Sequence, residues 1–166
     1  MKDFGDRIVA LLPGLRRFAR SLCRNSVEAD DLVQDSMMRA LAARASWRGD
    51  NLRAWLTTIM VNQYRNDLRR GRTAPVTLPI DDWQANVPDT ARGDPVEQLG
   101  LRAAIGRLTA DQRVVLMLVV VEGFSYEEVA ALLSIPVGTV MSRLSRARRS
   151  LDTMLNGDNV VELRRS

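Results

Sequence analysis

The chain has 166 residues, enough for one ordinary domain or two small ones, and its 24 basic and 20 acidic side chains give a net charge of +4. Lys2 is the only lysine, histidine is absent and Cys23 is the only cysteine. This composition excludes histidine-based acid–base catalysis, Ser–His and Cys–His nucleophilic sites, Cys/His zinc sites and an internal disulfide, but not carboxylate chemistry on bound magnesium.

The chain is predicted to contain a basic first block, an acidic linker and a second block whose basic residues are concentrated locally. Residues 1–72 hold 14 basic and 8 acidic side chains, a net +6, whereas residues 73–95 hold 1 and 4, a net −3. Four of the six prolines fall in this middle stretch, which therefore reads as a linker. Residues 96–166 carry a net +1. Two modules that bind one polyanion fit this pattern, and a single helical bundle with one long loop is the alternative.

The first block is predicted to form three helices, and neither block shows convincing strand-like alternation. Pro13 suits the first turn of a helix that ends near residue 24, and two more helices are expected over residues 27–44 and 51–70.

The sequence near the amino terminus lacks the apolar run of a signal peptide, and the longest apolar run, residues 114–121, is too short to cross a bilayer. We therefore expect an all-α protein of the cytoplasm, without membrane insertion of its own.

The helix over residues 27–44 has an apolar stripe and an acidic stripe. The apolar stripe consists of Leu32, Val33, Met37, Ala40 and Leu41. The second stripe, at helical spacing, consists of Asp31, Gln34, Asp35 and Met38. Asp30 and Asp31 also lie in the first turn, where the helix dipole favours acids. That capping role does not explain Gln34 and Met38, so the acidic stripe is predicted to bind a protein partner.

The helix over residues 51–70 is predicted to carry a row of hydrogen-bond donors beside its core stripe. The core stripe consists of Leu52, Trp55, Leu56 and Ile59, and the donor row of Thr58, Asn62, Arg65 and Arg69. The preceding loop consists of Trp47, Arg48, Gly49, Asp50 and Asn51. It offers an aromatic surface, a cation, a glycine and small polar groups, which together could hold an unstacked base. Burial of Trp47 in the core is an equally favoured reading.

The second block begins with three helix-capping patterns. Asp94-Pro95-Val96-Glu97, Thr109-Ala110-Asp111-Gln112 and Ser125-Tyr126-Glu127-Glu128 each have the form of a capping box. Gly123 is well placed to end the helix that precedes Ser125. After a helix over residues 125–133 and a turn at Ser134 and Ile135, Pro136 suits the first position of a further helix. Residues 125–151 therefore predict a helix-turn-helix.

The last helix is predicted to have one apolar and one DNA-binding face. The apolar face consists of Val137, Val140, Met141, Leu144 and Leu151, and the opposite face of Thr139, Ser142, Arg143 and Arg146, with Arg149 beside them. Residues 139–149 hold four arginines and no acid. Small residues allow close approach to a major groove, and arginines bind phosphates or guanine edges. Arg148 falls near the apolar side and is assigned to packing or an internal pair. An ordinary bundle with a solvated basic face is the alternative.

These motifs resemble those of a bacterial sigma factor of the extracytoplasmic-function (ECF) type, over residues 13–72 and 96–152. The matching stretches are D-D-L-V-Q-D at residues 30–35, N-L-R-A-W-L at 51–56 and S-Y-E-E-V-A…P-V-G-T-V…S-R-L-S-R-A-R at 125–148, in the family's order. The resemblance implies two small helical domains, sigma region 2 over residues 1–72 and the helix-turn-helix of region 4 over residues 96–155. It assigns no role to the tail, residues 156–166.

The resemblance also implies roles for the residues singled out above. The RNA polymerase-binding helix would present Asp30, Asp31, Gln34, Asp35 and Met38. The melted downstream promoter element would meet Trp47, Arg48, Gly49, Asp50, Asn51, Thr58, Asn62, Arg65 and Arg69. The upstream element would be read as duplex by Pro136, Gly138, Thr139, Val140, Ser142, Arg143, Arg146 and Arg149. The linker would pass near the polymerase active-site cleft.

The expected partners are core RNA polymerase, promoter DNA and an anti-sigma factor, with no cofactor, metal or catalysis. Three other readings remain: a sigma-like decoy that occupies an anti-sigma factor, a free-standing helix-turn-helix regulator, and a carboxylate-and-metal nuclease or phosphohydrolase. The regulator leaves the first block unexplained. The enzyme would need converging acids, whereas Asp30, Asp31 and Asp35 serve a helix start and an outward stripe.

Overall fold

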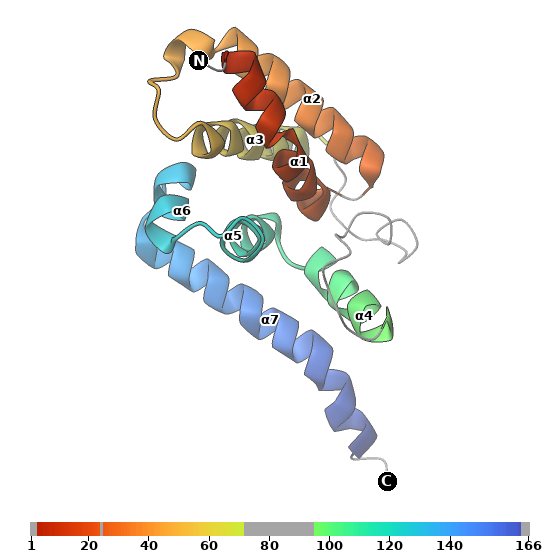
Figure 1. Cartoon of the computed structure of the whole chain (residues 1–166). Helices are drawn as coiled ribbons and strands as arrows, with labels where there is room; N and C mark the ends of the chain where they lie inside the picture. Colours follow the sequence, from red (N-terminus) through yellow and green to blue (C-terminus); the bar gives the residue numbers. More distant parts are fainter. Residues whose placement is uncertain (1–2, 24, 72–94, 164–166) are drawn as a thin grey trace. The chain divides into compact units, whose positions relative to one another are not determined.

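The computed structural model describes residues 3–23, 25–71 and 95–163, and over these ranges the regular structure is helical without strands. The chain divides into two compact units, residues 1–75 and 76–166, drawn in Figure 1. Of the predicted linker, residues 73–94 lie outside the described residues, and Pro95 begins the first helix of unit 2. None of the described helices is long and apolar enough to span a membrane. The all-α prediction is confirmed.

Unit 1 is built from helices that begin at polar capping residues. Its elements are α1 (Phe4–Leu22), α2 (Ser26–Ala42), the short 3-10 helix η1 (Arg44–Ser46) and α3 (Leu52–Arg69). The side chains of Asp3, Asn25 and Asn51 each accept a hydrogen bond from a backbone N–H of the helix that follows. Helix α2 packs against both α1 and α3, as Figure 1 shows, and the core between them is aliphatic with Phe18 and Tyr64.

The start of α1 differs from the prediction. We expected Pro13 in the first turn, but α1 begins at Phe4 and Pro13 lies inside it. A proline inside a helix removes one backbone hydrogen bond and costs roughly 3 kcal/mol. The buried side chains of Phe4 and Ile8 offset this cost, because they belong to the core only if the helix extends back to them. Tertiary packing therefore overrides the local signal of Pro13.

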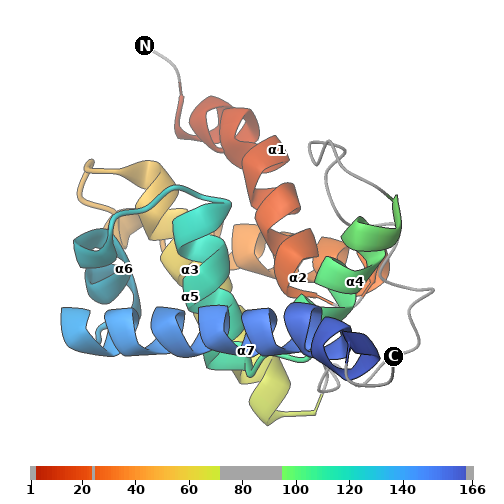
Figure 2. The same cartoon turned by 90° about the horizontal axis from the view of Figure 1, so that it is seen from below.

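The helix starts and ends in unit 2 agree closely with the predicted capping and turn residues. Its helices are α4 (Pro95–Gly106), α5 (Ala110–Val120), α6 (Tyr126–Leu133) and α7 (Val137–Leu163). Both described capping boxes are present, Thr109 with Gln112 and Ser125 with Glu128; Asp94, the cap expected for α4, lies outside the described residues. Gly123 has a φ of 70°, in the left-handed region that glycine adopts readily, after the end of α5. In Figure 2 α7 runs across one side of the unit and contacts α4, α5 and α6.

The turn between α6 and α7 confirms the helix-turn-helix. Ser134 ends α6 in the left-handed conformation with a φ of 54°, and the N–H of Ile135 donates to the carbonyl of Ala130 at 3.0 Å. Helix α7 begins at Val137, one residue after the expected position, since the Pro136 carbonyl accepts the first helical hydrogen bonds. The helix continues to Leu163, into residues 156–166 that we had assigned to a tail.

A buried arginine that the sequence analysis missed closes the turn between α4 and α5. Arg113 is only 3% exposed, and its guanidinium donates to the carbonyls of Ile105, Gly106 and Leu108, the closest at 2.8 Å. Ile105 and Gly106 are the last residues of α4 and Leu108 follows it, a region where backbone carbonyls lack the i+4 partner of a continuing helix. Arg113 thus replaces a cap for α4 and holds it on α5.

Replacing Arg113 with methionine, which has a similar length and no donors, is expected to lower the free energy of unfolding by about 2 kcal/mol. The loss comes mainly from the carbonyls of Gly106 and Leu108, which would remain buried without their charged donor. Thermal unfolding followed by circular dichroism measures it. Arg107→Met is the matched control, because Arg107 lies in the same turn with an exposed side chain. Equal effects of the two changes would contradict the capping role.

Candidate functional site

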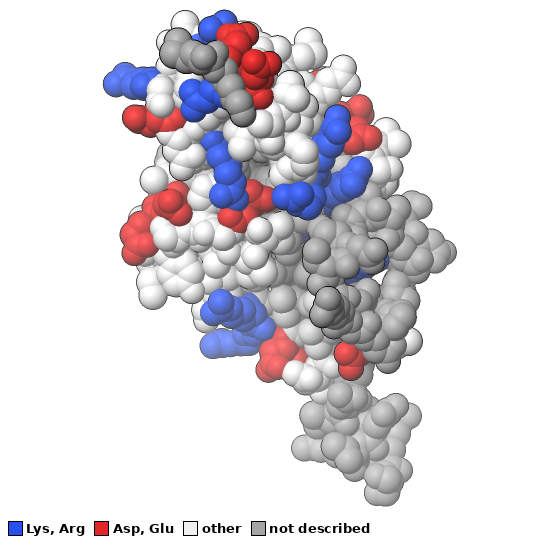
Figure 3. Space-filling view, viewed as in Figure 1, with Lys and Arg blue, Asp and Glu red and all other residues white. Residues whose placement is uncertain are grey.

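The exposed face of α7 carries hydroxyl and arginine side chains. The side chains on the opposite side are buried against the rest of unit 2: Val140, Leu144 and Ala147. The outward face, at helical spacing, consists of Gly138, Ser142, Ser145, Arg146 and Arg149. A Cβ added at Gly138 would meet nothing within 4 Å, so this position is open to a close approach from outside. Figure 3 shows basic side chains gathered over the first half of α7.

Two residues of α7 lie elsewhere than predicted, and a third has only one of its two predicted places. Val140, predicted both for the apolar face and among the DNA contacts, is fully buried and belongs to the core. Met141 was assigned to the apolar face but is 53% exposed, and Arg148 was assigned to packing but is exposed as well. The buried stripe consists of Val140, Leu144 and Ala147. Met141 and Arg148 lie to one side of this stripe and are therefore exposed. The exposed face is therefore broader than predicted and has one apolar side chain at its edge.

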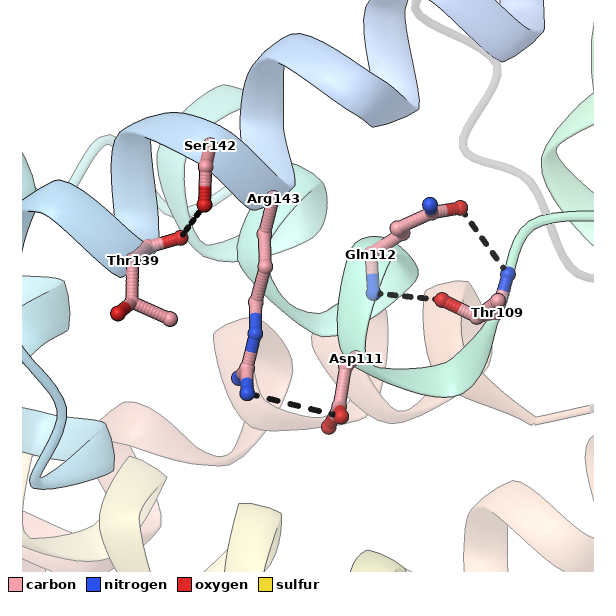
Figure 4. A network of polar contacts seen from close by, with 6 residues as sticks. All are labelled: Thr109, Asp111, Gln112, Thr139, Ser142 and Arg143. Carbon is pink, nitrogen blue, oxygen red and sulfur yellow. Dashed lines mark hydrogen bonds and ion pairs between the residues drawn. The ribbon is translucent and has the colours of Figure 1, made fainter.

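Arg143 is held inside unit 2 rather than directed outward. Its Nη2 lies 3.7 Å from the Oδ2 of Asp111 on α5, and only 25% of its side chain is exposed (Figure 4). Its Nη1 is buried and finds no hydrogen-bond partner among the residues that the structure describes. Figure 4 also shows the Ser142 hydroxyl donating to the carbonyl of Thr139 on the same helix, at 3.1 Å. Of the four arginines at 143–149, Arg143 thus faces α5, and the other three are exposed.

The acidic stripe of α2 is exposed. Asp30, Asp31 and Gln34 are exposed and Asp35 is half-buried, while Met38 is 64% exposed. The sequence analysis missed two members of this surface. Leu41, which was assigned to the core, and Val27 are both exposed. Ala29 and Ser36 are buried in their place, and the Ser36 hydroxyl donates to the Leu32 carbonyl at 2.6 Å. We call Val27, Asp31, Gln34, Met38 and Leu41 the α2 surface.

Hydrogen bonds fix both ends of the loop before α3. The Nε1 of Trp47 donates to the Asp50 carbonyl at 2.9 Å, and the Asn51 side chain accepts from the N–H of Ala54 at 3.1 Å, which caps α3. Between these ends Arg48, Gly49 and Asp50 are exposed, and Gly49 has a φ of 88°. Trp47 itself is half-buried and packs on Phe4. The loop therefore presents Arg48, Gly49 and Asp50 to the outside.

The donor row on α3 is only partly exposed. Asn62 and Arg69 are exposed, whereas Thr58 and Arg65 are half-buried, and the Thr58 hydroxyl donates to the Ala54 carbonyl at 2.9 Å. On the neighbouring face of α3, Leu52 and Leu56 are buried as expected, but Trp55 and Ile59 are half-buried. Met60, Val61 and Tyr64 complete that core instead.

Comparisons with known proteins cover both units. The family model for Sigma-70 region 2 matches residues 8–73, and the model for Sigma-70, region 4 matches residues 98–151. The ECF RNA polymerase sigma factor EcfG of Rhodopseudomonas palustris (strain TIE-1) is 42% identical over 163 residues, 95% of this chain and 87% of that protein.

Two solved structures extend this likeness to three dimensions. The sigma factor RpoE in complex with the anti-sigma factor NepR, from Bartonella quintana, has a TM-score of 0.73 at 37% identity and covers 94% of this chain and 98% of its own. CnrH in complex with the cytosolic domain of CnrY has a TM-score of 0.68 at 30% identity and covers 93% and 88%. Both structural matches therefore include unit 1 and unit 2 of this chain.

Proposed function

The chain belongs to the ECF group of the sigma-70 family, and from this premise we propose how its two units divide the work of promoter recognition. As an RNA polymerase sigma factor, it directs core polymerase to promoters and initiates transcription. One observation carries the division of labour: the exposed face of α7 holds hydroxyls and arginines, whereas the α2 surface holds a carboxylate and apolar side chains. The two surfaces suit partners of different chemistry.

Unit 2 binds the upstream promoter element as duplex DNA. Helix α7 enters the major groove with its first turns, where Gly138, Thr139 and Ser142 permit close approach, and Arg146 and Arg149 meet phosphates or guanine edges. The exposed Met141 lies at the edge of this face and suits contact with a thymine methyl group. Arg143, paired with Asp111, orients α7 on α5.

Unit 1 binds the melted downstream element through the loop at residues 47–51 and the neighbouring donor row of α3. The exposed Arg48 and Asn62 supply a cation and an amide, and Gly49 lets a base approach the backbone. The α2 surface of the same unit binds core polymerase. The linker, residues 73–95, connects the two promoter contacts, and residues 156–166 have no assigned role.

An anti-sigma factor controls this sigma factor. The structurally similar RpoE and CnrH were each solved with a partner, the anti-sigma factor NepR and the cytosolic domain of CnrY. The sigma-70 family is not a class of enzymes, and we propose that this chain has no catalytic activity or cofactor and acts in the cytoplasm, where it meets core polymerase and promoters.

Run-off transcription with purified core polymerase on a genomic promoter library tests the proposal. The chain is expected to select a small set of promoters that share an upstream and a downstream element. Core polymerase alone is the control and should give no promoter-specific product. Binding to an anti-sigma factor without any promoter-specific transcript would instead identify the chain as a decoy.

A further inference from the structure

The first turn of α1 contacts the loop at residues 47–51 through a cluster of aromatic rings. Phe4 is buried, and its ring centroid lies 5.3 Å from that of Trp47 and 6.3 Å from that of Trp55. Centroid separations in this range are typical of attractive aromatic pairs. Phe4 therefore joins the loop, through Trp47, to the first turns of α3, through Trp55.

Two arginines reinforce this cluster. The guanidinium of Arg7 lies over the Trp47 ring at 4.7 Å, and that of Arg44 lies over the Phe4 ring at 5.1 Å. Arg44 also approaches Asp3 at 3.9 Å, and the same carboxylate oxygen of Asp3 accepts from the N–H of Phe4. The amino end of α1 is thus fixed to η1 as well as to the loop.

These contacts determine the position of the exposed part of the loop. The indole N–H of Trp47 donates a hydrogen bond to the Asp50 carbonyl, so a displacement of Trp47 moves that carbonyl and the turn at Gly49 that precedes it. The guanidinium of Arg7 covers one face of the Trp47 ring, so a base could stack on that face only by displacing the guanidinium. Trp47 is therefore suited to fixing the conformation of the loop. Arg48, Gly49 and Asp50 remain exposed and available for DNA contact.

We propose that residues 4–7 of α1 are a positioning element for the promoter-binding loop, with Phe4 and Arg7 holding Trp47 in place. The inference rests on the proposed role of the loop in binding the melted strand. It adds a segment that the sequence motifs leave out, since the resemblance to the family began only at residue 13. Phe4 and Arg7 act through Trp47 and are positioning residues, not DNA contacts.

The test compares Arg7→Ala with Arg16→Ala in the reconstituted holoenzyme. Arg16 is the matched control, because it is also exposed on α1 and its loss removes the same charge. Open-complex formation, followed by the fluorescence of 2-aminopurine in the downstream element, is expected to fall about threefold for Arg7→Ala and to stay unchanged for Arg16→Ala. Affinity for core polymerase should be the same for both variants, and Arg7→Ala should lower the unfolding temperature by no more than the few degrees that one cation–π contact contributes, whereas a general loss of structure would lower both quantities strongly.

A double-mutant cycle shows whether Arg7 acts through Trp47. In a Trp47→Ala background, Arg7→Ala should have no further effect on opening, because its partner ring is gone. An undiminished threefold effect in that background would mean a direct DNA contact and overturn the inference, as would equal opening by Arg7→Ala and Arg16→Ala. Failure of the unmodified holoenzyme to open any promoter would instead overturn the proposed function.

Discussion

Replacing Arg146 and Arg149 together with alanine is expected to weaken binding to duplex promoter DNA by roughly 30- to 100-fold at low salt. Each exposed arginine that meets a phosphate or base edge contributes about 1–3 kcal/mol. The dependence of log K on log salt should also become shallower by about 1.8, since each phosphate contact adds about 0.9 to the slope. Fluorescence anisotropy of a labelled duplex, titrated at several salt concentrations, measures both quantities.

Arg143→Ala is the comparison that makes this result informative. It removes the same charge from the same helix, but from a side chain that is paired with Asp111. We expect a smaller loss of affinity and a nearly unchanged salt slope. If Arg143→Ala lowered the slope as much as a single change at Arg146 or Arg149, the guanidinium would leave Asp111 for a phosphate, and its assignment to orienting α7 would be wrong.

Replacing Asp31 and Met38 with alanine is expected to weaken binding to core polymerase by roughly 30-fold or more. The two exposed side chains lie on the α2 surface, and if each contributes about 1 kcal/mol to the interface, the loss for the pair is about 2 kcal/mol. Affinity for duplex promoter DNA should not fall, because unit 2 supplies that contact. A competition assay with labelled sigma factor and purified core polymerase gives the affinity.

The matched control for the α2 surface is the pair Asp6→Ala and Val9→Ala on α1. It also removes one exposed carboxylate and one apolar side chain, and Val9 is 63% exposed against 64% for Met38. This control should bind polymerase normally. Equal losses in both double variants would show that the α2 surface is not the polymerase contact.

The ends of most helices were predictable because capping is a local interaction. The capping boxes at Thr109 and Ser125 and the turn at Ser134 use residues within four positions of each other, so their spacing is visible in the sequence. The start of α1 was not predictable in this way. It depends on Phe4 packing against Trp47 and Trp55, which are distant in sequence, and this packing outweighs the local preference of Pro13.

The predicted surfaces were identified at the level of helix faces, but not of every residue. A periodicity of 100° per residue separates inside from outside, yet it cannot tell whether Ala147 or Met141 completes the core. Pairs between elements are likewise invisible. Nothing in the spacing links Arg143 to Asp111 or Arg113 to the end of α4, since these contacts exist only after α4, α5 and α7 have packed.

The exposure of Met38 and Met141 has a consequence for oxidative damage. The lone cysteine, Cys23, is buried, so its thiol is shielded from peroxide, whereas the thioethers of Met38 and Met141 are exposed to solvent. Oxidation of methionine gives a polar sulfoxide. One such sulfur lies on the α2 surface and the other beside the outward face of α7. We therefore expect peroxide to act on this protein first through sulfoxides rather than through sulfenic acid, and a methionine sulfoxide reductase to reverse the effect.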